Sequence, residues 1–123
     1  MEGRLHYFKA QILLETGKYF QAIQSATEAC KIDPKSDSFL LVLARSQLAF
    51  GEISMAIKNF EMVVDRTSNF DLKNDALSDL KWSLQLLQQK NLILEEKKSK
   101  LSHNDFHFLS NLREGQDIFE NKK

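Results

Sequence analysis

The two histidines near the carboxyl end are spaced in a way that suggests metal chemistry. His103 and His107 lie four residues apart with Asp105 between them. On a helix this spacing places two imidazoles on one face, where both can reach the same metal ion. No third ligand is evident, and the glutamate of the His-Glu-x-x-His signature is missing. Solvated histidines are the preferred interpretation, and we predict no metal site and no cofactor.

Cys30 is the only cysteine and the only candidate thiol nucleophile. It follows Ala29 late in a segment of helix-forming residues, and no histidine or aspartate is placed to activate it. We therefore expect a small side chain that packs inward rather than a reactive thiol. The chain also lacks a glycine-rich phosphate loop, a Gly-x-Ser-x-Gly motif and a Cys-x-x-Cys pair. These observations predict a protein that is not an enzyme.

The composition disfavours partners that are recognised by charge. Seventeen basic residues balance seventeen acidic ones, so no net field attracts nucleic acid or an anionic membrane surface. The longest apolar run, Phe39 to Ala44, is too short to span a bilayer. The amino terminus lacks the pattern of a secretory signal, and a single cysteine fits a reducing compartment. We expect a cytoplasmic or nuclear protein that binds neither nucleic acid nor membrane.

An internal repeat of 34 residues organises the first half of the chain. The positions that recur at this spacing are Gly17 and Gly51, Ala22 and Ala56, Ala10 and Ala44, Leu14 and Leu48, and Ala29 and Val63. Small residues let neighbouring helices approach closely, and a glycine just after a helix tolerates a positive φ. Phe60 fills space where its counterpart is Ala26. The pattern predicts two tandem helix pairs.

Helix formers and punctuation residues place five helices. We expect them near 5–15, 19–31, 37–50, 53–67 and 75–101. Asp33-Pro34 ends the second helix, because proline cannot continue it. Ser36 or Asp37 can cap the third helix, and Asn69, Asp71 or Asn74 the fifth.

The fifth helix carries a heptad-like leucine stripe. Its members are Leu77, Leu80, Leu84, Leu87, Leu94 and Leu101, with Asn91 and Lys98 at intervening positions. The favoured interpretation is that the first half of this helix caps the second repeat; the alternative is a helix that pairs with a partner helix. Trp82 lies off the stripe, and we expect it to pack against the fourth helix rather than to anchor a partner.

The duplicated Gly-x-x-x-x-Ala step resembles the tetratricopeptide repeat family, whose period is 34 residues. The resemblance implies an all-α fold: a short right-handed α-solenoid of two helix pairs with a long C-terminal capping helix. We expect one domain over 1–101, with repeats at about 3–36 and 37–70 and a capping helix at about 72–101. Residues 102–123 are expected to form a flexible or loosely packed tail.

The family further implies a non-catalytic scaffold that binds a protein or peptide on its concave face. Counting along the first helix of each pair places six residues on that face: Tyr7, Gln11 and Leu14, then Leu41, Arg45 and Leu48. Some of these side chains alternatively cover the fifth helix. One subclass grips a terminal carboxylate with lysine and asparagine, but Phe8 and Val42 stand at the asparagine positions and Arg45 is a lone cation. We expect no carboxylate binding of that kind.

A structural role is the alternative function. Two repeats are fewer than the roughly three that a solenoid usually needs, so the fifth helix must supply part of the scaffold. The chain is either a short homologue or part of a longer scaffold, and its first helix pair would then lack a neighbour on one side. The alternative is a structural subunit or a homodimer that assembles through this pair and the leucine stripe.

Overall fold

A computed structural model describes residues 2–101 of the 123-residue chain. The helices are α1 (Glu2–Glu15), α2 (Tyr19–Ile32), α3 (Asp37–Phe50), α4 (Ile53–Arg66) and α5 (Phe70–Leu101). No strand occurs between residues 2 and 101. The prediction of an all-α fold is confirmed, and the bounds of α2, α3 and α4 agree with the sequence to within one residue.

The chain divides into two compact units, Met1–Leu87 and Gln88–Lys123, and α5 runs through both. In the second unit, the side chains from Gln88 to Glu95 are all exposed. The expected tail at 102–123, with His103, Asp105 and His107, lies outside the described residues. The domain boundaries expected from the sequence remain a proposal.

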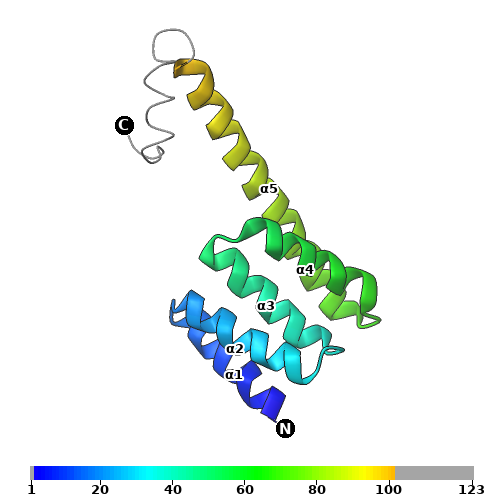
Figure 1. Ribbon diagram of the computed structural model, residues 1–123. Coiled ribbons are helices and arrows are strands. Elements are labelled where there is room, and N and C mark those ends of the chain that lie inside the picture. Colours follow the sequence, from blue (N-terminus) through cyan, green and yellow to red (C-terminus); the bar gives the residue numbers. More distant parts are fainter. Residues whose placement is uncertain (1, 102–123) are drawn as a thin grey trace. The chain divides into compact units, whose positions relative to one another are not determined.

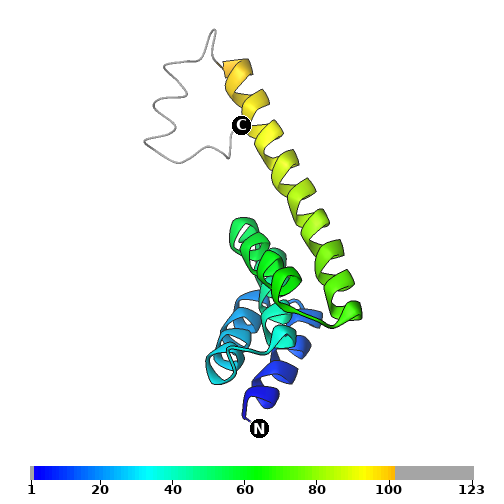
Figure 2. The same cartoon turned by 90° about the vertical axis from the view of Figure 1, so that its right-hand side faces the viewer.

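The first unit contains two antiparallel helix pairs. α1 packs on α2 and α3 packs on α4, while α3 also contacts both helices of the first pair (Figures 1 and 2). The predicted contact positions are fully buried in both repeats: Ala10, Ala22, Ala26, Ala29, Ala44, Ala56, Phe60 and Val63. The 34-residue repeat is therefore a repeat of packing as well as of sequence.

Local signals in the sequence end and begin these helices. Gly17 and Gly51 have φ of 84° and 107°, in the left-handed region that glycine adopts without strain. The side chain of Ser36 caps α3, because its Oγ accepts a hydrogen bond from the Phe39 amide at 3.2 Å. α2 ends at Ile32, directly before Asp33-Pro34, as expected. The turns thus follow from residues that were recognisable in the sequence.

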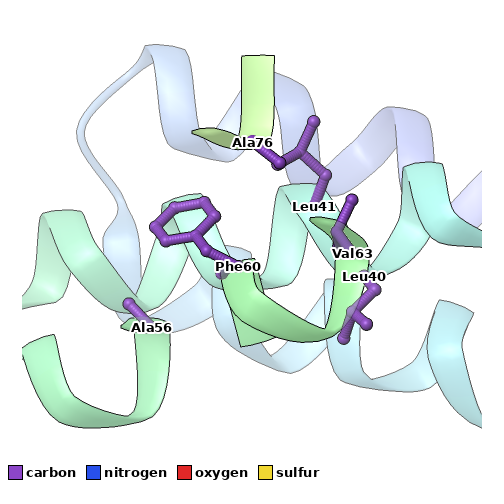
Figure 3. Packing of buried hydrophobic residues seen from close by; sticks show 7 residues of the cluster. Leu40, Leu41, Ala56, Phe60, Val63 and Ala76 are labelled. Atoms are coloured by element: carbon purple, nitrogen blue, oxygen red, sulfur yellow. The ribbon is translucent and has the colours of Figure 1, made fainter. Parts of the chain in front are cut away.

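The larger of two apolar clusters joins α3, α4 and the first half of α5. Phe60 and Val63 of α4 meet Leu40 and Leu41 of α3, and Ala76 of α5 lies beside Leu41 (Figure 3). Among the residues whose burial the structure describes, Phe60 is the largest fully buried side chain. Burial of a side chain of this size contributes about 1.5–3 kcal/mol relative to exposure. The prediction that the first half of the last helix covers the second repeat is confirmed.

The face of α5 that makes this contact overlaps the predicted leucine stripe only in part. Ala76 and Ser83 are fully buried, whereas Leu77 and Leu84 of the leucine stripe are 43% and 47% exposed. Small residues seven apart let α5 approach its neighbours closely, so Leu77 and Leu84 turn outward, while Leu80 of the same stripe packs against the larger cluster. Ser83 satisfies its buried hydroxyl by donating to the Asp79 carbonyl at 2.8 Å.

α5 also starts earlier than expected, at Phe70 rather than Asp75. The Asn69 side chain accepts a hydrogen bond from the Leu72 amide at 3.0 Å, which is the interaction of a capping residue. Asn69 was one of three cap candidates, and its selection adds a turn to the helix.

Candidate functional site

Tyr7, Gln11 and Leu14 lie along α1, and all three side chains are half-buried. The Gln11 Nε2 donates to the Tyr7 hydroxyl at 3.2 Å, and the Tyr7 ring packs on Phe39 of α3 with centroids 5.1 Å apart. Leu14 packs against the smaller cluster, formed by Ala10, Ala26 and Val42. Contacts with α2 and α3 thus hold this triplet in place, while each side chain keeps part of its surface accessible.

The second triplet, on α3, is covered more deeply because α5 lies next to it. Leu41 is 5% exposed and belongs to the larger cluster, together with Ala76 of α5. Leu48 is half-buried against the same cluster. Leu41 is therefore part of the core under the proposed face, and its side chain is almost inaccessible to a partner.

Arg45 is the cation of the proposed face, and Asp79 neutralises it. The Arg45 Nε lies 2.6 Å from the Asp79 Oδ2, and the two side chains are 41% and 27% exposed. Such a short charge-assisted hydrogen bond orients the guanidinium toward α5. Asp79 was not recognised in the sequence, although it stands 34 residues after Arg45, at the next step of the repeat.

The two triplets are brought near each other by the packing of α1 on α3. Among residues 2–101, no hydrogen bond or ion pair joins one triplet directly to the other. Phe39 of α3 contacts Tyr7 of the first triplet. The six residues thus belong to one scaffold, and their role in binding remains a proposal.

Cys30 packs against the larger cluster, as expected of a small inward-facing side chain. Burial raises the pKa of the Cys30 thiol above its ordinary value of 9.0, and the positive charge of Arg66 acts in the opposite direction. A raised pKa leaves little thiolate near neutral pH, which disfavours nucleophilic chemistry. Within the described part of the chain, no group of three or more histidine, cysteine or acidic side chains could hold a metal ion.

Several large apolar side chains are exposed, and one of them corrects a prediction. Trp82 is 54% exposed, so the expectation that it packs in the core against α4 is wrong. The face of α5 that packs against the larger cluster carries Leu72, Ala76 and Leu80, and Trp82 is not part of it. Phe20 and Phe50, also half-exposed, pack on each other with centroids 5.6 Å apart.

Comparison with known proteins gives a consistent set of relatives. The chain is 36% identical over 90 residues to tetratricopeptide repeat protein 33 of Xenopus laevis. The aligned region covers 72% of this chain and 34% of the Xenopus protein. The Homo sapiens protein of the same name is 29% identical over 108 residues, covering 87% of this chain and 40% of its own length. The Mus musculus protein is 33% identical over 89 residues, covering 72% and 33%.

The chain carries tetratricopeptide repeats. The named relatives and the two observed helix pairs agree on this assignment. No family model matches the chain, and no solved structure matches it. The chain spans about a third of the length of the Xenopus relative.

These tetratricopeptide pairs form a helical repeat of the kind that serves in protein interaction. Along residues 2–101, no helix is both long enough and apolar enough to cross a membrane.

Proposed function

We propose that this chain is a non-catalytic adaptor that binds a protein segment on the face formed by α1 and α3. The observation that carries the proposal is the partly exposed row Tyr7, Gln11 and Arg45, held on two adjacent tetratricopeptide pairs. Tyrosine and arginine are enriched among the residues that dominate binding energy at protein interfaces. A tyrosine whose hydroxyl is already hydrogen-bonded loses little side-chain freedom when a partner docks on its ring.

The charge of this face indicates the chemistry of the partner. Asp79 already neutralises Arg45 at 2.6 Å, so an anionic group would have to displace a short ion pair. The remaining groups are an aromatic ring, an amide and aliphatic side chains. The favoured partner is therefore an extended or helical segment with apolar anchors and neutral hydrogen-bonding groups, rather than an acidic peptide. The single cysteine supports placing this interaction in the cytosol or nucleus.

The test is affinity capture from a cell extract followed by binding measurements with each captured partner. Tyr7→Ala and Arg45→Ala remove the two largest groups of the proposed face. Lys58→Ala is the matched control, because Lys58 is an exposed residue of α4 and belongs to neither helix of the proposed face. We expect Tyr7→Ala to raise Kd by roughly tenfold or more, and the control to leave it unchanged.

A second variant separates the charge argument from the site argument. Asp79→Asn releases Arg45 from its ion pair without removing the cation, so a neutral partner should bind it with nearly unchanged affinity. Equal binding of a reproducible partner to Tyr7→Ala, Arg45→Ala and Lys58→Ala would show that the face is wrongly assigned. A large gain in affinity on Asp79→Asn would instead show that the partner is acidic.

A further inference from the structure

An apolar stripe runs along the outer side of α1. Leu5, Phe8 and Ile12 are 68%, 51% and 61% exposed. They follow a spacing of three and four residues, which places them on one face of the helix. The opposite face of α1 holds the fully buried Ala10 and packs on α2 and α3. The stripe therefore faces away from the rest of the first unit, and within residues 2–101 nothing covers it.

The repeat shows that this face is built for packing. The residues 34 positions after Leu5, Phe8 and Ile12 are Phe39, Val42 and Ser46 of α3. Val42 is 5% exposed and Ser46 is fully buried, and Val42 packs against Ala10 and Ala26 of the first pair. Phe39 packs on Tyr7. The same face is thus an interior contact in the second pair, whereas in the first pair it carries a leucine, a phenylalanine and an isoleucine that residues 2–101 leave more than half exposed.

The charges beside the stripe favour a second copy of the same chain as its cover. Arg4 and Glu15 are exposed, are separated by eleven residues in the sequence, and lie along the same flank of the stripe. Neither takes part in any of the ion pairs found among residues 2–101. In an antiparallel pair of helices related by a twofold axis, the same flank of both helices meets. Arg4 then faces the partner subunit's Glu15, and the contact occurs twice by symmetry.

We propose that the chain forms a twofold dimer in which α1 packs antiparallel on the α1 of a second copy. Leu5, Phe8 and Ile12 of both subunits make the apolar contact, and the two Arg4–Glu15 pairs set the register. Lys9 lies on the other flank, near its own symmetry mate, and its long side chain can turn into solvent. The dimer uses the outer side of α1, so it leaves Tyr7 and Gln11 on their own side of the helix. The dimer does not rest on the proposed adaptor function, although the Phe8 ring lies beside the Tyr7 ring with centroids 5.4 Å apart.

Sedimentation equilibrium of the full chain over a range of concentrations tests the proposal directly. Phe8→Glu should raise the dimer Kd by at least about tenfold, because it places a charge at the centre of an apolar contact. Met55→Glu is the matched control, since Met55 is 52% exposed on α4 and outside the stripe. Circular dichroism at 222 nm should show the same helix content in both variants, because neither side chain belongs to the core.

Charge reversal supplies a second, independent readout. Arg4→Glu and Glu15→Arg alone should each weaken the dimer by roughly three- to tenfold, since each puts like charges together at two symmetric places. The double variant should return Kd to within about twofold of the original, because the opposite charges meet again. The single-variant effects should shrink at high salt.

Three results would overturn the proposal. A monomer at every concentration would mean that another protein, or a helix pair from outside these residues, covers the stripe. A dimer that Phe8→Glu leaves intact would place the contact elsewhere, for example at the exposed leucines of α5. Loss of the dimer on Phe8→Glu without rescue by the double charge reversal would exclude the antiparallel register.

Discussion

Replacement of Phe60 by alanine tests whether the second helix pair and α5 form one cooperative core. Phe60 is fully buried and contacts a cluster that draws on α3, α4 and α5. A buried phenylalanine replaced by alanine typically costs about 3–5 kcal/mol, through lost transfer energy and the cavity left behind. The unit from Met1 to Leu87 has an expected stability of roughly 4–13 kcal/mol at the usual value per residue. Phe60→Ala should therefore remove a large part of it.

The measurement is urea unfolding followed by circular dichroism at 222 nm, with Phe70→Ala as the control. Phe70 is 75% exposed, and its replacement should change the free energy of unfolding by no more than about 0.5 kcal/mol. The denaturation midpoint of Phe60→Ala should fall while its m-value stays constant, as expected if only stability changes. A loss below about 1 kcal/mol, or equal losses for both variants, would refute the cooperative core described above. A changed m-value would show that the unit does not unfold as one.

Two further predictions concern single positions. Gly51→Ala should lower the free energy of unfolding by about 1–2 kcal/mol, because alanine is strained at a φ of 107° even though its Cβ would meet no atom within 4 Å. Gly17→Ala, at a φ of 84°, should have a similar effect. An unchanged thermal midpoint for both variants would contradict this prediction. Cys30 should react with iodoacetamide at pH 8 more slowly in the native state than in urea, since burial raises its pKa, and equal rates would contradict the burial. Because the native thiol binds its proton more tightly than the unfolded one, its contribution to stability is present below the unfolded value of 9.0 and is lost as the pH rises through the native value.

The helix pairs were predictable because their signals are local. Gly17, Gly51 and Ser36 act within a few residues of themselves, through positive φ or a capping hydrogen bond. The small residues Ala22 and Ala56 repeat at the spacing that brings each pair into contact. Local chemistry and a fixed period therefore sufficed to place α2, α3 and α4 to within one residue.

The surface was less predictable, because it depends on which helix covers which face. Leu41 was expected on the binding face, yet α5 covers it and leaves 5% of it exposed. Trp82 was expected to be buried, yet the side of α5 that packs carries Ala76 and Ser83 instead. A row of large apolar residues predicts that a helix face is buried. Where two helices approach most closely, however, the buried positions are occupied by small residues. On α5 the two criteria agree at Leu80, which packs against the larger cluster, and differ at Leu77 and Leu84, which are 43% and 47% exposed.

The sequence by itself determined the repeat, the helices and the positions at which the helices of a pair touch, because helix periodicity and glycine conformation are properties of short segments. The tertiary structure alone decided which periodic face is buried, because burial requires a neighbour and the neighbour comes from elsewhere in the chain. Arg45 and Asp79 became a pair only when α5 packed on α3. Leu5, Phe8 and Ile12 stand out as an uncovered face only because their counterparts on α3 are covered.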